Sequence, residues 1–247
     1  MTSSYDVPKR WFLHFYIVGV VVNFVLLSFI LLGWFPQPVY SLLHLLHMPN
    51  RIPEVDVLPV LLVLVMELIQ VVRRAYECLY VHVFSNSNMS IVHYVIGLLF
   101  YAMFGVCMLS AVDYKHLTVT TEHTSAHDVA HYILGFTIFT IASVCQHGSF
   151  QTLASLRKSS SGQVENTKHL IPSGGLFEYV CCPHFFTEII IYLAMNIVLG
   201  FEHQTAVAYL IFVIVNQSIM SWMSHRWYRE NFSSYPPKRA AVIPFIF

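Results

Sequence analysis

The sequence predicts an all-α membrane protein, a bundle of about six transmembrane helices that forms a single domain over residues 1–247. Three observations support this fold class. Of the 247 residues, 56% are hydrophobic and only 11% are charged, with a mean hydropathy of +0.62, whereas a soluble domain carries about 25% charged residues. Apolar runs of the length that crosses a bilayer, about 17–25 residues, recur along the chain. Neither an internal repeat nor a separate soluble segment interrupts them.

The N-terminal part of the chain contains two of these runs. Trp11–Trp34 is long enough to span the membrane and ends at Pro36. Val39–Met48 is too short to span, which indicates an interfacial or re-entrant segment. Leu58–Val72 is the second predicted span. It continues without a helix breaker into RRAYECLYVHVFS, residues 73–85, so we expect this basic segment where the span reaches the membrane surface.

Four further spans are predicted in the rest of the chain. They are Ile91–Val112, the somewhat short Val129–Val144, Phe185–Phe201 and Ala206–Trp222. The polar connection Gln146–Gly175, which contains SLRKSSSGQ, is the longest loop. A basic, aromatic tail follows the sixth span.

A charge asymmetry predicts the orientation in the membrane. The net charge is zero, but with six spans and both termini on one side, that side holds 11 of the 13 basic residues. They are Lys9, Arg10, Arg73, Arg74, Arg157, Lys158, Lys168, Arg226, Arg229, Lys238 and Arg239. The opposite side holds only Arg51 and Lys115. The positive-inside rule assigns the richer side, with both termini, to the cytosol.

Cysteine and histidine usage gives no sign of a metal centre. The five cysteines form no CxxC pair, and apolar packing of reduced thiols explains them. The fourteen histidines are scattered and include no HExxH motif. The first ten residues are polar and the following run is too long for a signal peptide, so we expect no cleavable signal.

The stretch Ile171–Glu188, IPSGGLFEYVCCPHFFTE, is the first candidate for chemistry. Gly174 and Gly175 allow a turn or close approach to a ligand, and His184 stands at the mouth of a predicted helix. Glu188 lies about one turn inside the apolar segment, where a carboxylate is costly and indicates a functional site. The alternative is an interfacial turn with an aromatic belt.

Two basic segments are the other candidates. Arg73, Arg74 and Glu77 are spaced to pair along one helix, or they form a helix end whose side chains snorkel to the interface. The tail SHRWYRENFSSYPPKRAAVIPFIF interleaves cationic and aromatic residues. Guanidinium groups suit phosphates and rings suit stacking, so the tail predicts an anionic ligand with flat rings.

These segments carry a resemblance to a known family. HRWYRENFSSYPPKRAAVIPFIF resembles the C-terminal signature of the steroid 5α-reductase family, and GGLFEYVCCPHFFTEI is similar to its second signature. RRAYECLYVHVFS resembles a segment that the family shares with the trans-2-enoyl-CoA reductases. DVPKRWFLHFYIV and ECLYVHVFSNS are particularly like the branch of the family that reduces a polyprenal. The resemblance covers essentially the whole chain.

The resemblance implies which residues line an NADPH site. The implied cofactor-binding residues are Arg74, Gln146, Arg157, His169, His184, Glu188, Tyr228 and Arg239. The steroid enzymes have Asn where Gln146 and His184 align and Tyr where His169 aligns, so hydrogen-bonding ability is kept at all three. No GxGxxG motif opens a helix after a strand, so a Rossmann site is not expected.

The catalytic candidates are His225, Gln70 and His14. The steroid enzymes use a Glu in the helix that matches Trp11–Trp34 and a Tyr just before the matching Arg. Here the first helix has no Glu and Val71 stands at the Tyr position, so Gln70 and His14 are the polar candidates nearby, with Tyr16 beside them. His225 lies in the tail signature, where it contacts the cofactor or, alternatively, caps a helix-end carbonyl.

The family usually has seven spans, so the resemblance implies that its N-terminal span is missing here, as in a short or trimmed form. It further implies an endoplasmic-reticulum enzyme that uses NADPH to reduce the α,β-double bond of polyprenal in dolichol synthesis for protein N-glycosylation. We expect the lipid bilayer as partner, and neither nucleic acid nor metal. Three alternatives stay open: a steroid 5α-reductase, a membrane methyltransferase of isoprenylated cysteine, and a non-catalytic transporter-like or scaffolding protein.

Overall fold

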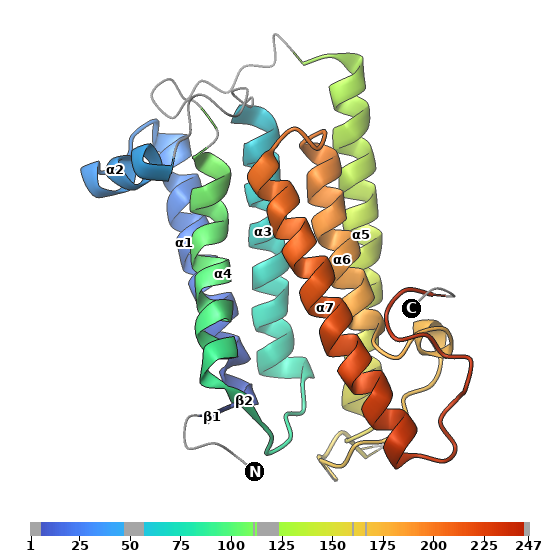
Figure 1. Ribbon diagram of the computed structural model, residues 1–247. Helices are drawn as coiled ribbons and strands as arrows, with labels where there is room; N and C mark the ends of the chain where they lie inside the picture. Colours follow the sequence, from blue (N-terminus) through green and yellow to red (C-terminus); the bar gives the residue numbers. More distant parts are fainter. Residues whose placement is uncertain are drawn as a thin grey trace.

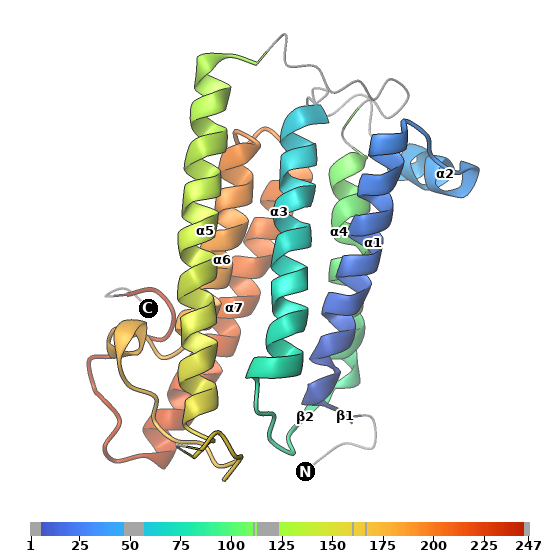
Figure 2. The ribbon, with the colours of Figure 1, turned by 180° about the vertical axis from the view of Figure 1, so that it is seen from behind.

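The residues that the structure describes form a bundle of six long helices. The computed structural model describes residues 6–46, 57–110, 112, 124–159, 161–165 and 167–244. The bundle helices are α1 (Phe12–Leu32), α3 (Val57–Tyr76), α4 (Ile91–Leu109), α5 (Ala126–Ser155), α6 (Pro183–Val198) and α7 (Gln204–Asn231) (Figures 1 and 2). They run up and down, so that α1 begins and α7 ends at the same end of the bundle (Figure 1).

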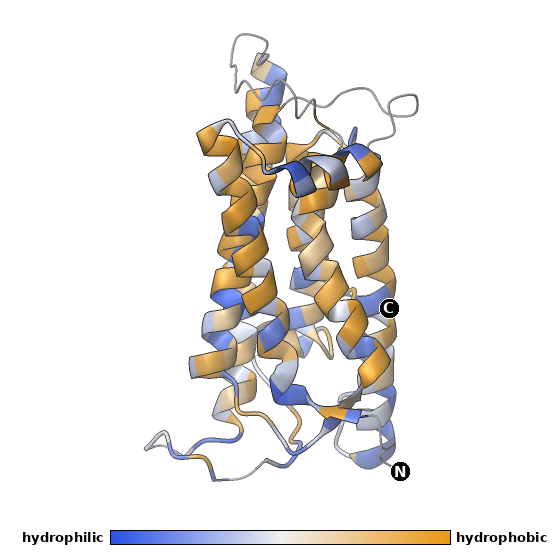
Figure 3. Cartoon of the chain, turned by 90° about the vertical axis from the view of Figure 1, so that its left-hand side faces the viewer, coloured by the Kyte–Doolittle hydropathy of each residue, from blue (hydrophilic) through white to orange (hydrophobic). Residues whose placement is uncertain are grey.

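Among the described residues, four helical segments are long and apolar enough to cross a membrane by length and composition: Lys9–Leu32, α4, α5 and α7. Figure 3 shows the helices as largely hydrophobic along their length, with hydrophilic loops gathered at the end near the N-terminus. The fold class, an all-α membrane protein, is confirmed. α3 carries Glu67, Arg73 and Arg74, and α6 has 16 residues, so the count of six spans stays a prediction.

Short elements lie at the two ends of the bundle. α2 (Gln37–Leu46) has ten residues and lies across the bundle at the end away from the N-terminus (Figures 1 and 2), as a helix too short to span would. At the other end β1 (Asp6–Pro8) pairs antiparallel with β2 (Asn88–Ser90). A single 3-10 turn, Lys9–Trp11, leads from β1 into α1. The pairing fastens the N-terminal segment to the connection between α3 and α4.

Local sequence signals set several helix ends. α1 ends at Gly33, whose φ of 63° lies in the left-handed region that glycine adopts freely. α5 begins with a capping box, in which the Ser125 side chain and the Asp128 side chain each bond the other's backbone N–H. α6 has Pro183 in its first turn, where the missing N–H costs nothing.

Two predicted helix ends were wrong. α5 continues beyond Val144 to Ser155, so the first ten residues of the predicted loop are helical. Gln146, Phe150 and Ala154 extend the buried face of α5 at i, i+4, i+8 spacing, which stabilises the extra turns although their outer face is polar.

The helix α7 continues beyond Trp222 to Asn231, so the start of the predicted tail is helical. Arg226 Nε donates to Glu230 Oε1 at 2.7 Å, an i, i+4 pair that supports these polar turns. His225 and Tyr228 therefore project from a helix.

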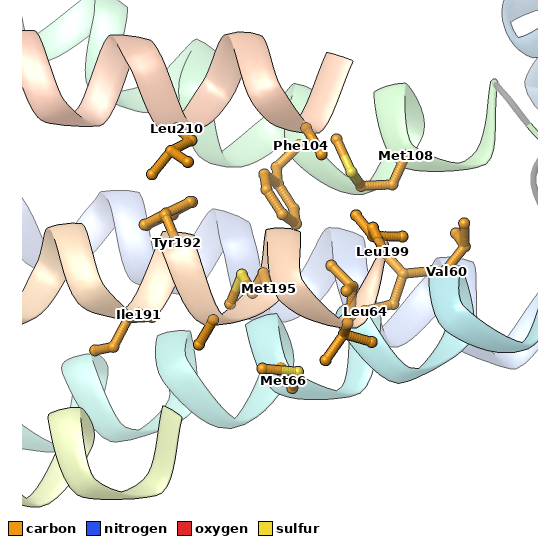
Figure 4. Close-up of a cluster of buried hydrophobic side chains, with 14 of the residues drawn as sticks. Val60, Leu64, Met66, Phe104, Met108, Ile191, Tyr192, Met195, Leu199 and Leu210 are labelled. Carbon is orange, nitrogen blue, oxygen red and sulfur yellow. The ribbon is translucent and has the colours of Figure 1, made fainter. Parts of the chain in front are cut away.

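The core lies between α3, α4, α6 and α7. Figure 4 shows part of it, with Leu64 and Met66 from α3, Phe104 from α4, Tyr192 from α6 and Leu210 from α7. These side chains are buried, and together they hold the helices that surround the site described below.

The C-terminal segment folds back on the connection between α5 and α6. The backbone N–H of Ala240 donates to Tyr179 O at 2.9 Å, and the N–H of Cys181 donates to Ala240 O at 2.8 Å. Val242 is fully buried. The two segments that the sequence singled out, one before α6 and one at the tail, are thus joined.

Candidate active site

Two facing helices carry polar side chains into an otherwise apolar bundle. α3 ends at the end of the bundle where α6 begins (Figure 1), so the two are antiparallel. Spacings of i, i+3, i+7 on α3 and i, i+4, i+8 on α6 place the side chains of each set on one face. Together with one residue of α5 we call this set the polar ladder: Glu67, Gln70 and Arg74 of α3, Gln146 of α5, and His184, Glu188 and Tyr192 of α6.

An ion-pair cluster around Glu77 closes the outer end of the ladder. The fully buried Glu77 accepts from Arg73 Nη1 at 2.5 Å, pairs with Arg74, and lies 2.9 Å from His147 Nδ1. It begins one π-helical turn, Glu77–Val81, a feature frequent at functional sites. Because both arginines turn inward, the expected pairing is confirmed and the snorkelling alternative is wrong.

The Arg74 guanidinium is enclosed by the ladder's outer wall. Its Nη2 donates to the Tyr16 hydroxyl at 3.0 Å. Its Cζ lies 4.0 Å from the Phe150 ring centroid and 5.0 Å from that of Tyr16, within the range of cation–π attraction. These contacts fix a cation at the inner cavity described below.

Glu188 is the acceptor at the middle of the ladder. It is buried and accepts from Gln146 Nε2 at 2.5 Å and from Gln70 Nε2 at 3.2 Å. Gln146 Nε2 also lies 3.0 Å from the His184 carbonyl oxygen. Three helices, α3, α5 and α6, thus meet at one hydrogen-bonded carboxylate.

An outer cavity of about 550 Å³ opens at the end of the bundle that carries the chain ends. Lys9, Arg157, Lys168 and His169 supply its basic character. Trp227 and Tyr228 of α7 add aromatic faces. Cationic groups beside flat rings suit an anionic ligand that contains phosphates and aromatic rings.

Hydrogen bonds fix the wall of the outer cavity. Arg157 Nη1 donates to Val83 O at 2.5 Å, and the Tyr228 hydroxyl donates to Leu170 O at 3.1 Å. The ring centroids of His169 and Trp227 are 5.0 Å apart. The connection between α5 and α6 is therefore tied to α7 and to the segment after α3.

An inner cavity of about 360 Å³ continues into the bundle. Ladder residues form its polar wall: Arg74, Gln146, His184, Glu188 and Tyr192. Its apolar wall comes mainly from α1, α4 and α7: Phe12, Phe15, Ile96, Gly97, Phe100, Phe212 and Val213. Seven residues line both cavities, namely Lys9, His82, Phe84, Phe150, His184, Met220 and Ser224. The two cavities are therefore adjoining parts of one site.

Two imidazole nitrogens at this junction lack partners. His82 Nε2 and His184 Nδ1 are buried and form no hydrogen bond with the described residues. Burial and the nearby Arg74 guanidinium lower the pKa of His82 to about 4. Burial, with Arg157 and Lys9 nearby, also lowers the pKa of His169. Both rings are neutral near pH 7, so lysine and arginine supply the positive charge.

The structure brings most of the predicted cofactor-binding residues to these cavities. Those that line the outer cavity are Arg157, His169, His184 and Tyr228. Those that line the inner cavity are Arg74, Gln146, Glu188 and again His184. Arg239 does not line either cavity: it is buried behind the outer wall and donates from Nη1 to Pro172 O at 3.0 Å.

None of the three predicted catalytic residues lines the outer or the inner cavity. Gln70 is fully buried behind Glu188. His225 Nδ1 lies 3.0 Å from the Tyr235 hydroxyl. His14 Nδ1 lies 2.9 Å from the Tyr94 hydroxyl.

Sequence reasoning missed several lining residues. Lys9 counted only toward the charge asymmetry, although it precedes α1 inside the motif DVPKRWFLHFYIV. His82 lies inside the motif ECLYVHVFSNS but was not singled out, and Lys168, like Lys9, counted only toward the charge asymmetry. Tyr192 could have been found from its spacing to His184 and Glu188 on α6.

The cysteines and the possible metal ligands were the other side chains considered in the sequence. All five cysteines are free. In the ranges that the structure describes, no three His, Cys, Asp or Glu side chains gather where they could hold a metal ion.

Comparisons with known proteins identify relatives of this chain. Residues 87–247 match the family described as 3-oxo-5-alpha-steroid 4-dehydrogenase. Polyprenal reductase of Xenopus tropicalis is 37% identical over 98% of this chain and 81% of its own length. The human polyprenal reductase is 36% identical over 99% of this chain and 79% of its own. That of Danio rerio is 35% identical over 98% and 80%.

These similarities run through the segments that form the two cavities and confirm the resemblance found in the sequence motifs. The chain belongs to the 3-oxo-5-alpha-steroid 4-dehydrogenase family, the steroid 5α-reductases.

Proposed function

We propose that this protein uses NADPH to reduce the α,β-double bond of polyprenal to dolichal, in dolichol synthesis for protein N-glycosylation. The observation that carries the proposal is the pair of adjoining cavities, cationic and aromatic outside, apolar inside. Its relatives named polyprenal reductase support the choice of substrate. The inner cavity suits a conjugated aldehyde on a long isoprenoid chain, because its polar wall can face the aldehyde and its apolar wall the isoprenoid.

The residues of the outer cavity fit NADPH. Lys9, Arg157 and Lys168 suit its phosphates, and Trp227 and Tyr228 suit its rings. The unpartnered nitrogens of His82 and His184 at the junction are free to bond a polar group of a ligand. When bound, NADPH supplies the hydride for the double bond.

The inner cavity fits a lipid substrate. Ile96 of α4 and Phe212 of α7 line it and are also exposed on the surface of the bundle, by 45% and 43%. In a membrane this side faces lipid tails, so an isoprenoid chain can extend from the cavity into the bilayer. The conjugated aldehyde then lies against the polar ladder, which can stabilise the negative charge that develops on its oxygen.

The predicted residues that do not line a cavity have a positioning role in this proposal. Gln70 holds Glu188, Arg239 holds the Pro172 wall, and His225 holds Tyr235. His14 holds Tyr94 beside α1. Their role is to position the residues that line the two cavities.

We place the protein in the endoplasmic-reticulum membrane as a single multi-pass domain, with the outer cavity and both termini facing the cytosol. The basic residues near the outer cavity support this orientation. NADPH then reaches the site from the cytosol and the lipid substrate from the bilayer.

Purified protein incubated with NADPH and a short polyprenal tests the function. We expect loss of nicotinamide absorbance matched by formation of the saturated aldehyde, identified by mass spectrometry. Parallel reactions contain an enone steroid, or S-adenosylmethionine with an isoprenylated cysteine. Oxidation with the steroid alone, methyl transfer, or no turnover with any substrate would contradict the proposal.

A further inference from the structure

The deepest rung of the polar ladder consists of Glu67 on α3 and Tyr192 on α6. Along two antiparallel helices, each step forward on one helix faces a step backward on the other. Gln70 contacts Glu188, so Glu67, one turn earlier on α3, faces Tyr192, one turn later on α6. Glu67 lies near the middle of the 20-residue α3. An ionisable group at that depth indicates a functional site.

Neither member of this rung has a hydrogen-bond partner. Both carboxyl oxygens of Glu67 and the hydroxyl of Tyr192 are buried and unpartnered among the described residues. Glu67 is fully buried, and Tyr192 is 1% exposed. The two groups lie close enough to interact, but they do not meet in a formed hydrogen bond. Buried polar groups are rarely left without a hydrogen-bond partner, so these two side chains are candidates to bind a polar group of a ligand.

The hydrogen bonding of the Tyr192 hydroxyl differs from that of the polar groups nearer the outer end of the ladder. Tyr192 lines the inner cavity. The Tyr16 hydroxyl is bonded to Arg74, and Gln146 is bonded to Glu188. Tyr192 therefore lines the cavity with a buried hydroxyl that interacts with Glu67 and makes no bond to the Arg74, Gln146 and Glu188 groups of the ladder.

The surroundings of Glu67 favour its protonated form. The side chains that act on it are Glu188 and Tyr192, and neither is a cation. A carboxylate with no cation beside it in an apolar bundle is strongly disfavoured. Glu67 therefore holds a proton next to Tyr192.

We propose that Tyr192 is the catalytic hydroxyl that donates to the carbonyl oxygen of the substrate, and that Glu67 is the positioning residue that supplies its proton. This inference rests on the proposed reduction of a conjugated aldehyde by a reduced nicotinamide. Tyr192 and Glu67 would then supply the proton that the carbonyl oxygen takes up during that reaction.

The step balances in atoms and electrons. Hydride forms a C–H bond at the β-carbon, the C=C π pair shifts to join the α-carbon and the carbonyl carbon, and the carbonyl π pair moves to oxygen. Tyr192 gives its proton to that oxygen, and Glu67 gives its own to Tyr192. The enol becomes the saturated aldehyde when its O–H proton is lost and the α-carbon gains one. The proton lost from oxygen restores Glu67 through Tyr192. The α-carbon proton comes from a hydronium ion of the solvent, so each turnover consumes one proton.

Substitutions that keep the shape of each side chain test the roles of Tyr192 and Glu67. Tyr192→Phe and Glu67→Gln are each expected to lower kcat for polyprenal by about 10²-fold or more, the scale of general-acid catalysis. The KM for NADPH should stay within about two-fold, because neither residue lines the outer cavity. Tyr209→Phe is the matched control: it removes a hydroxyl from the neighbouring aromatic cluster without touching the cavity lining. Its kcat should match that of the unaltered protein.

A second measurement does not depend on turnover. Infrared difference spectra of farnesal, labelled with ¹³C at the carbonyl and bound without cofactor, report the hydrogen bond directly. We expect a lowered C=O stretching frequency in the unaltered protein and in Tyr209→Phe. The frequency should return to the value of farnesal in hydrocarbon in Tyr192→Phe. Glu67→Gln should keep the lowered frequency but lose turnover.

The outcomes separate the two proposals. Absence of polyprenal reduction in the unaltered protein overturns the proposed function. Reduction in the unaltered protein with unchanged kcat and unchanged carbonyl frequency in Tyr192→Phe overturns only the role of Tyr192. If Tyr192→Phe fails to fold, Glu67→Gln decides, and unchanged kcat in that variant overturns the inference.

Discussion

At the scale of single residues, Glu77 is the side chain on which the outer site depends most. It is fully buried and bound by Arg73, Arg74 and His147. Removing one partner of a buried ion pair leaves the other charge uncompensated and costs about 3–5 kcal/mol. Glu77→Gln is therefore expected to lower the unfolding temperature markedly and to lose NADPH binding, because Arg74 is released from its position.

Glu230 supplies the control for Glu77. It forms an i, i+4 pair with Arg226 on the exposed surface of α7, and such pairs contribute about 0.3–0.5 kcal/mol. Thermal unfolding of Glu230→Gln should match that of the unaltered protein. Equal stability of the two variants would show that Glu77 has no special role.

Arg157 lines the outer cavity, so it is the residue with which to test cofactor binding. A hydrogen bond to a charged group contributes about 1.5–3 kcal/mol, and 1.4 kcal/mol corresponds to about ten-fold in affinity. Arg157→Ala is expected to raise the KM for NADPH by about ten-fold or more. The exposed Arg226→Ala should leave it unchanged. An unchanged KM in Arg157→Ala would remove this residue from the site.

His225 is expected to act on the cofactor cavity through two tyrosines. It bonds the Tyr235 hydroxyl, and the Tyr235 ring stacks on that of Tyr228 with centroids 5.5 Å apart. We expect His225→Gly to abolish polyprenal reduction while the protein inserts and accumulates. His225→Gln, which keeps a side chain able to bond Tyr235, should retain measurable turnover. Full activity in a well-folded His225→Gly protein would leave His225 with a structural role only.

At the scale of elements, the close packing of α5 on α6 depends on one glycine. A Cβ on Gly135 would lie 2.4 Å from Val198 Cγ2 and 2.9 Å from the Ala194 carbonyl oxygen. Gly135→Ala must force the helices apart, and overpacking of this kind costs about 1–3 kcal/mol. Gly148 on the same helix has no atom within 4 Å of such a Cβ, so Gly148→Ala should stabilise α5 by about 0.5–1 kcal/mol. Thermal unfolding of both variants in one detergent checks the opposite signs.

The elements also show what a sequence can and cannot predict. Long apolar runs locate α1, α4 and the middle of α5, because the bilayer requires length and hydropathy. The last turns of α5 and α7 are amphipathic or polar, so hydropathy alone ends them too early. Burial of Phe150 supports the last turns of α5, and it shows only when the neighbouring segments are in place. The Arg226–Glu230 pair supports those of α7, and it is a local i, i+4 signal that hydropathy does not detect.

Only part of the site could be predicted, because some of its contacts join residues far apart in the sequence. Motifs and their resemblance identified Arg157, His184 and Glu188, which line the cavities. They could not show that Arg239 binds a backbone carbonyl behind the wall, because that contact joins residues 67 positions apart. Nor could they pair Glu67 with Tyr192, because the pairing depends on the register of two antiparallel helices.

At the scale of the whole molecule, the basic residues predict a single orientation. Eleven of the thirteen belong to segments at one end of the bundle. In sealed microsomes, a membrane-impermeant maleimide added outside is expected to label Ser161→Cys. It should label Ala126→Cys, at the start of α5 and the opposite end, only after the membrane is opened. Both positions are exposed. The reverse pattern would invert the topology and place the outer cavity in the lumen.

The backbone pairing of Ala240 with Tyr179 and Cys181 has a consequence for biogenesis. A ribosome makes the chain in order, so residues 240–242 emerge after all six long helices. The outer cavity shares its wall with the segment that these residues hold. The bundle can therefore be inserted into the membrane before the cavity wall is fastened, and we expect nascent chains to pass through a stage that is integrated but cannot yet bind the proposed dinucleotide. A stop codon just before Ala240 would hold the protein at that stage, as a membrane-inserted protein without the closing segment.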